Sequence, residues 1–82
     1  MNRISGFGEA VRSLRRERGL SQEALAEKAN LHTNYISLVE RGLSAPALDT
    51  ICALADALEV TVSGLAVEME KNAVRSSRAK LP

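Results

Sequence analysis

Four polar side chains between residues 33 and 41 have the types and spacing needed to bind a large polar ligand. They are Thr33, Asn34, Ser37 and Arg41, and on a helix this spacing places them on one outward face. Hydroxyl, amide and guanidinium groups pair with base edges and phosphate oxygens. The pattern therefore favours contact with a nucleic acid over chemistry on a small substrate.

Residues that could support catalysis or bind a metal are isolated along the chain. His32 is the only histidine and Cys52 the only cysteine, so a zinc site with several cysteines is excluded and His32 has no obvious second ligand. Cys52 falls in the apolar pattern of residues 48–58, which predicts burial rather than nucleophilic reactivity. No Ser/His/Asp set, glycine-rich phosphate loop or carboxylate pair stands out. We therefore expect no enzyme, no cofactor and no metal.

Length and composition indicate one small cytoplasmic domain. The 82 residues are 45% hydrophobic and 26% charged, enough for one core but not for a deep catalytic cleft. No run approaches the roughly 18 apolar residues of a membrane span, and a single cysteine fits a reducing cytosol. We expect no membrane partner.

The formal charge of +1 conceals a division along the chain. The net charge is +2 over residues 1–41, −5 over residues 42–70 and +4 over residues 71–82. A near-neutral total therefore does not exclude a nucleic-acid partner, because the polar face lies in the basic part. The aromatic content of 2% argues against base-stacking platforms for RNA or single strands.

Short helices are predicted to position the polar face. Alanine and leucine are abundant and no segment alternates apolar and polar residues long enough for a strand, so we predict an all-α fold. A first helix ends at Gly19, and Ser21 caps a two-turn second helix that stops at Asn30. Thr33 is the predicted cap of a third helix that ends at Gly42. Two short helices joined by a tight turn are therefore expected.

Several separated motifs agree in order and spacing with one known family. They are Gly19-Leu20-Ser21-Gln22-Glu23-Ala24-Leu25-Ala26, Tyr35-Ile36-Ser37, Glu40-Arg41-Gly42, Pro46 and Leu48. Over about residues 7–68 the chain resembles the helix-turn-helix family of phage Cro and repressor proteins, also called the XRE family. The resemblance implies a compact five-helix bundle, a lambda-repressor-like DNA-binding domain, whose last two helices cover about residues 48–58 and 62–69, the last capped by Thr61. With its C-terminal extension the chain also resembles the controller proteins of restriction-modification systems.

The chain departs from the controller pattern in three places. Controller proteins commonly open the third helix with Asp-Arg-Thr-Tyr, whereas this chain has His32-Thr33-Asn34-Tyr35, so no operator sequence carries over. Asn30 and Glu59 stand where relatives commonly have glycine. A non-glycine residue in a left-handed turn costs only about 1 kcal/mol, so we expect the fold to tolerate both.

The resemblance implies that the third helix lies in the major groove of double-stranded DNA. Thr33 and Asn34 then face base edges, with Ser37 one turn later, as the candidates for base readout. Asn34 suits adenine and the Thr33 methyl group suits thymine, although Thr33 is equally well explained as the helix cap. His32 is a weaker candidate for DNA contact and is otherwise an exposed residue of the turn.

Four further positions match family residues near the phosphate backbone. They are Gln22, Tyr35, Arg41 and Ser44. The alternatives are a solvated Gln22 and a half-buried Tyr35 that covers the core. Arg12 is another candidate for phosphate contact and is otherwise solvated. In relatives, the arginine matching Arg15 pairs with the glutamate matching Glu40, so we expect a structural ion pair.

One helix-turn-helix reads few base pairs, so a homodimer on two half-sites is expected. Its interface is predicted in the acidic, apolar segment 42–70, with Val62, Leu65 and Ala66 at the centre; alternatively, these residues complete the core of the monomer. The domain is expected over residues 1–70, followed by a flexible basic tail over residues 71–82.

These expectations describe a regulator of transcription that binds a palindromic or pseudo-palindromic operator as a homodimer in the bacterial cytoplasm. RNA polymerase is a candidate second partner. One alternative is an antitoxin that binds a toxin partner. Another is a module of the same fold that binds protein instead of DNA.

Overall fold

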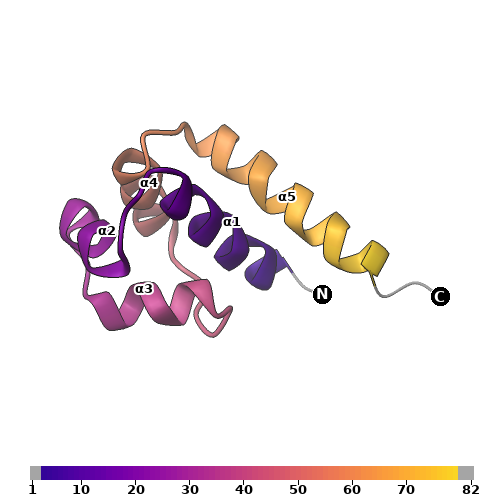
Figure 1. Ribbon diagram of the computed structural model, residues 1–82, viewed down its shortest axis with the longest axis horizontal. Helices are drawn as coiled ribbons and strands as arrows, with labels where there is room; N and C mark the ends of the chain where they lie inside the picture. Colours follow the sequence, from indigo (N-terminus) through magenta and orange to yellow (C-terminus); the bar gives the residue numbers. More distant parts are fainter. Residues whose placement is uncertain (1–2, 80–82) are drawn as a thin grey trace.

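The described part of the chain forms five helices, and α5 runs alongside α1 while α2 and α3 lie on the opposite side of α1 (Figure 1). The computed structural model describes the backbone of residues 3–79 and the side chains of residues 4–72. In chain order the helices are α1 (Arg3–Glu17), α2 (Gln22–Ala29), α3 (Thr33–Glu40), α4 (Leu48–Ala57) and α5 (Val62–Ala79). The described residues contain no strand. The predicted all-α, five-helix fold is confirmed.

Capping side chains begin two of the helices, and left-handed residues end two, largely where the sequence predicts. The hydroxyls of Ser21 and Thr61 each accept a hydrogen bond from a backbone N–H three residues later, at 3.0 and 2.9 Å. Asn30 and Glu59 both adopt left-handed conformations, with φ of 58° and 60°. The two positions where relatives commonly have glycine therefore keep the turn that glycine would make.

The start of the third helix differs from the prediction. His32 takes the capping position without a side-chain hydrogen bond, and Thr33 is already the first helical residue. The cap role predicted for Thr33 is therefore wrong. Its hydroxyl is not used to satisfy the start of α3.

The last helix is longer than predicted. α5 continues past Met69 to Ala79, so it crosses the expected boundary between residues 70 and 71 without a break. The basic residues of the predicted tail, Arg75, Arg78 and Lys80, lie outside the described side chains.

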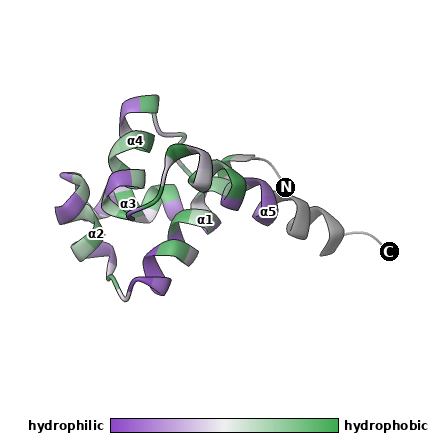
Figure 2. Cartoon of the chain, turned by 90° about the horizontal axis from the view of Figure 1, so that it is seen from above, coloured by the Kyte–Doolittle hydropathy of each residue, from purple (hydrophilic) through white to green (hydrophobic). Residues whose placement is uncertain are grey.

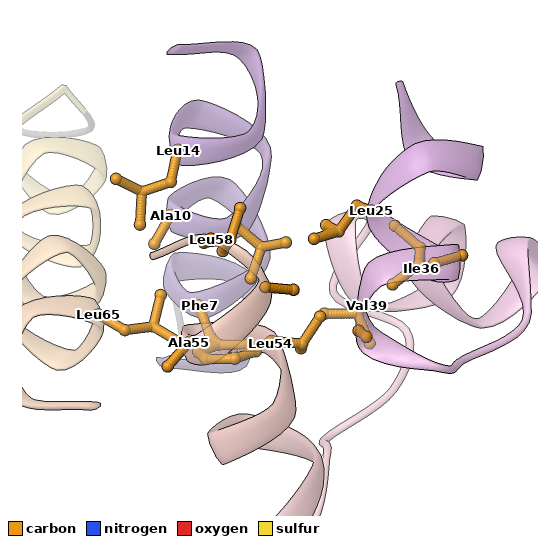
Figure 3. Close-up of a cluster of buried hydrophobic side chains, with 14 residues drawn as sticks. Phe7, Ala10, Leu14, Leu25, Ile36, Val39, Leu54, Ala55, Leu58 and Leu65 are labelled. Carbon is orange, nitrogen blue, oxygen red and sulfur yellow. The ribbon is translucent and has the colours of Figure 1, made fainter. Parts of the chain in front are cut away.

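A single apolar core joins all five helical segments of the chain. Figure 2 shows both hydrophobic and hydrophilic residues in α2 and α4, as expected for helices that bury one side. In Figure 3, Leu65 of α5 extends toward Phe7 of α1 and Ala55 of α4. Leu65 is 0% exposed, so the prediction that it lies at a dimer interface is wrong. The alternative, completion of the monomer core, is correct for this residue.

Cys52 is exposed, contrary to the prediction of burial. Residues four apart on a helix share a face, and Leu48, one turn before Cys52, is 71% exposed. The buried face of α4 is instead formed by Leu54 and Ala55, with Leu58 just after the helix. The apolar pattern of residues 48–58 was therefore too broad to separate the two faces.

The described residues contain neither a single helix suited to span a membrane nor a cluster of metal-binding side chains. No single helix there is long and apolar enough to cross a membrane; only Leu48–Ala57 and Val62–Asn72 taken together, bent by 96°, have the length and composition. Among the same residues, no group of three or more His, Cys, Asp or Glu side chains could hold a metal ion.

Candidate nucleic-acid interface

The helix-turn-helix consists of α2, three connecting residues and α3. α2 ends because Asn30 turns left-handed, and the Leu31 N–H then donates to the Ala26 carbonyl at 2.8 Å. Leu25 and Ala26 of α2 and Ile36 of α3 are buried, which holds the two short helices together. The small Ala26 side chain permits their close approach. The outer side of α3 is thereby turned away from the core.

The predicted reading residues lie on this outer side. Thr33 and Asn34 are exposed, and Ser37 is half-buried. The side chains of Thr33 and Asn34 form no hydrogen bond with any other described residue. Both side chains therefore keep their full capacity to bond with an outside partner. A shallow open hollow lies over this part of α3, and its lining residues are His32, Thr33, Asn34, Tyr35 and Leu38.

The candidates for contact with the DNA phosphate backbone lie beside the outer side of α3. Tyr35 is half-buried and packs against the core, as one of its two predicted roles requires. Arg41 is exposed and its Nε donates to the Ser37 carbonyl at 3.3 Å, which steers the guanidinium back along α3. Ser44 is half-buried in the segment between α3 and α4. Contact of these residues with phosphate remains a prediction.

A buried carboxylate joins three helices on the inner side of α3. Glu40 is 2% exposed, and its Oε2 accepts from Arg15 Nε at 2.6 Å while Oε1 accepts from Arg15 Nη2 at 3.1 Å. Arg15 also donates to the Leu20 carbonyl at 2.8 Å. The expected ion pair of Arg15 and Glu40 is therefore present. It fixes the end of α3 against α1 and the α1–α2 turn.

Gln22 and Arg12 complete this cluster. The Gln22 amide donates to Glu40 Oε1 at 3.0 Å, and Arg12 Nε reaches the same oxygen at 3.5 Å. Arg12 also lies 3.7 Å from a Glu9 carboxylate oxygen. Arg12 is therefore not the solvated arginine of the sequence-based alternative. Gln22 already has a protein partner, so a phosphate contact would need its second amide hydrogen.

The cluster keeps Glu40 ionised. Burial acts to raise the pKa of the Glu40 carboxyl, but hydrogen bonds from Arg15 and Gln22, the charge of Arg15 and the hydrogen bond from Arg12 outweigh burial and hold the pKa below its usual value. No buried side-chain nitrogen or oxygen among the described residues lacks a hydrogen-bond partner. The buried charge is therefore fully compensated.

The remaining interface candidates are exposed on α5. Val62 is 41% exposed, and Ala66, four residues later on the same face, is also exposed. Val67 is also 54% exposed, but it lies on a different face of α5, since neighbouring residues on a helix do not share a face. Unlike Leu65, Val62 and Ala66 leave apolar surface on the outside of the bundle.

Two residues and one contact that matter to this interface were not predicted from the sequence. Leu38 was not singled out, although it lies one turn after Asn34 and borders the same hollow. The bond between Gln22 and Glu40 depends on how α2 and α3 cross, which spacing along the chain does not encode. Gly8 was also missed: a Cβ there would contact the Val39 carbonyl and come within 2.7 Å of the Glu40 carbonyl oxygen. Only the small size of glycine could have signalled that close helix crossing.

Known proteins share this arrangement. A family profile described as helix-turn-helix matches residues 11–65. The control protein C.SmaI of Serratia marcescens is 47% identical over 59 residues, which cover 72% of this chain and 70% of that protein. The immunity repressor protein of Bacillus phage phi105 is 43% identical over 61 residues, which cover 74% of this chain and 42% of the repressor. The chain thus spans less than half the length of that repressor.

A solved structure extends the likeness to three dimensions. It is the restriction-modification controller protein C.Esp1396I, crystallised as a tetramer in complex with its natural 35 base-pair operator, with a TM-score of 0.81 and 28% identity over 88% of this chain and 95% of that chain. The family profile covers more than half of the chain and includes both helices of the helix-turn-helix. The chain therefore belongs to the XRE-type helix-turn-helix family of DNA-binding transcriptional regulators.

Proposed function

We propose that the chain binds double-stranded DNA in a sequence-specific way and regulates transcription as a homodimer on a palindromic or pseudo-palindromic operator. The carrying observation is the outer side of α3, where Thr33 and Asn34 are exposed and, within the described side chains, have no hydrogen-bond partner. Unpaired donors and acceptors on a rigid helix are what base readout in the major groove requires. The related controller protein, crystallised in complex with its natural operator, supports DNA binding by a protein of this fold.

The more specific proposals concern subfamily, compartment and partners. A controller-type regulator is favoured because the chain spans 70% of C.SmaI and resembles C.Esp1396I over nearly its full length. Action on DNA in the bacterial cytoplasm follows from this proposal, with RNA polymerase as the partner that would receive the regulatory signal. If the chain does not bind DNA, we expect a toxin partner or another protein-binding role instead.

Binding to duplex DNA is expected to be strong at low salt and to weaken steeply with salt. Fluorescence anisotropy with a random duplex should show an affinity loss of at least about tenfold between about 50 and 200 mM salt, because bound phosphates release counterions. On a selected site, Asn34→Ala should remove about 1–3 kcal/mol of discrimination at one base pair, whereas Arg41→Ala should weaken all sequences alike. Salt-independent binding, or none, would exclude the DNA-binding function. An equal loss on every sequence would exclude readout by Asn34.

The dimer is proposed to form through the exposed apolar face of α5 that carries Val62 and Ala66. These side chains are exposed in the monomer, so charge can be introduced without disturbing the core. Sedimentation at tens of micromolar should give a dimer for the natural chain and a monomer for the double variant Val62→Glu/Ala66→Glu, with an unchanged helical content by circular dichroism. Leu43→Glu, at a 66% exposed site between α3 and α4, is the control and should still dimerise. A natural chain that stays monomeric on DNA would refute the interface.

A further inference from the structure

An apolar side chain interrupts the polar outer side of α3. Leu38 is 36% exposed and lines the hollow that Thr33 and Asn34 also border. It is not among the residues of the buried core or those packed against it. Its neighbours Ile36 and Val39 are both 0% exposed, so the core already has its apolar contacts from α3 without Leu38. A leucine on the outer side of α3 is thus available to a ligand.

The position of Leu38 relative to Asn34 limits what it can touch. Side chains four residues apart on a helix stand above one another, about 5–6 Å apart. Base pairs in DNA are stacked about 3.4 Å apart. If Asn34 faces one base pair in the major groove, Leu38 therefore faces another base pair one or two steps away.

A leucine has no donor or acceptor, so it can distinguish base pairs only by apolar contact. In the major groove the apolar group on a natural base pair is the C5 methyl of thymine, and cytosine carries hydrogen at the same carbon. The hydroxyl and amide groups beside Leu38 pair with polar edges and do not make this distinction. The Thr33 methyl group can make it, but Thr33 lies at the start of α3, five residues before Leu38, and therefore faces a different base pair.

We propose that Leu38 is a specificity-determining residue that reads a 5-methylpyrimidine in the operator. This inference rests on the proposed DNA-binding function and names a chemical group that the function requires. Thymine is the expected partner, and 5-methylcytosine satisfies the same contact because its methyl group occupies the same place in the groove. Cytosine methylation at that position is then expected to strengthen binding.

The test removes one methyl group at a time from a duplex selected with the natural chain from a random pool. Each thymine is replaced by deoxyuridine, which keeps the base pair and deletes only the methyl group. Burial of one methyl or methylene group contributes about 0.8 kcal/mol, so the natural chain should lose about fourfold in affinity at one position of each half-site. Leu38→Ala should show no loss at that position. Leu43→Ala, truncated at an exposed leucine outside α3, should keep the fourfold loss.

A second substitution distinguishes the methyl group from the base that carries it. Placing a cytosine at the sensitive position should weaken binding by the natural chain, and 5-methylcytosine should recover about fourfold of the affinity. The proposal is overturned if deoxyuridine changes the affinities of the natural chain and of Leu38→Ala by the same factor at every position, or if the selected site has no thymine that responds. Those outcomes leave salt-dependent DNA binding intact, whereas failure of the proposed function removes it.

Discussion

Replacing Glu40 by glutamine is expected to lower the free energy of unfolding by about 3–5 kcal/mol. The substitution keeps the size of the side chain but removes the charge that compensates Arg15, whose side chain is only 11% exposed. A small domain has a total stability of about 5–15 kcal/mol, so the variant should be marginally folded. Urea unfolding followed by circular dichroism measures the loss. Glu27→Gln, at an exposed site of α2, is the control and should change stability by less than about 0.5 kcal/mol.

The same carboxylate should make the natural chain sensitive to acid. Because the pKa of Glu40 is lower in the folded chain, its contribution is fully present above the unfolded-state pKa, near the ordinary value of 4.5, and is lost as the pH falls through the folded-state pKa. Glu40→Gln resembles the protonated form and should lack this part of the pH dependence. The double variant Arg15→Met/Glu40→Gln should lose less stability than the two single losses combined. Strict additivity, or a Glu40→Gln variant as stable as the natural chain, would contradict the structural role of the pair.

Replacing Gly8 by alanine is expected to separate α1 from the end of α3. The added Cβ would collide with the Val39 carbonyl and lie 2.7 Å from the Glu40 carbonyl oxygen. Both are backbone atoms, so no side-chain rotation can relieve the contact, and the helices must move apart. Overpacking of this kind costs about 1–3 kcal/mol. The displacement also weakens the bonds between Arg15 and Glu40, so the loss should fall at the upper end of that range.

The matched control for Gly8→Ala is the same change at Gly64. This glycine is exposed in the first turn of α5, and a Cβ there would meet only side-chain atoms and no backbone, the nearest being the Thr61 hydroxyl oxygen at 3.1 Å. Alanine gains helix propensity at that site, so a change within about 1 kcal/mol in either direction is expected. If Gly8→Ala were as well tolerated as Gly64→Ala, the close crossing of α1 and α3 would not be needed for stability.

The fold could be predicted largely because its signals are local. Ser21 and Thr61 cap their helices, and Asn30 and Glu59 make left-handed turns, through bonds and dihedral angles within a few residues. The paired apolar faces of α2 and α3 follow from helical spacing alone. The predicted end of α5 near Met69 was too early: residues 70–81 contain no glycine or proline, so nothing in the sequence stops the helix there.

The site was predictable in its residue types but less so in its contacts. Spacing placed Asn34 and Ser37 on the outer side of α3, and family likeness paired Arg15 with Glu40. Whether Leu65 faces the core or a partner depends on which side of α5 meets α1, a long-range fact. The contacts of Arg12 and Gln22 with Glu40 could not be predicted either, because they form only where three helices cross.

The two sides of α3 are energetically separate. Its inner side, with Ile36, Val39 and Glu40, carries the packing and the buried charge, while Thr33, Asn34 and Leu38 are exposed outside the core. Substitutions on the outer side therefore leave stability nearly unchanged. Under the proposed function, single substitutions on this outer side are expected to change the preferred DNA sequence while the protein still folds. The same bundle is thus a durable scaffold on which recognition can diversify.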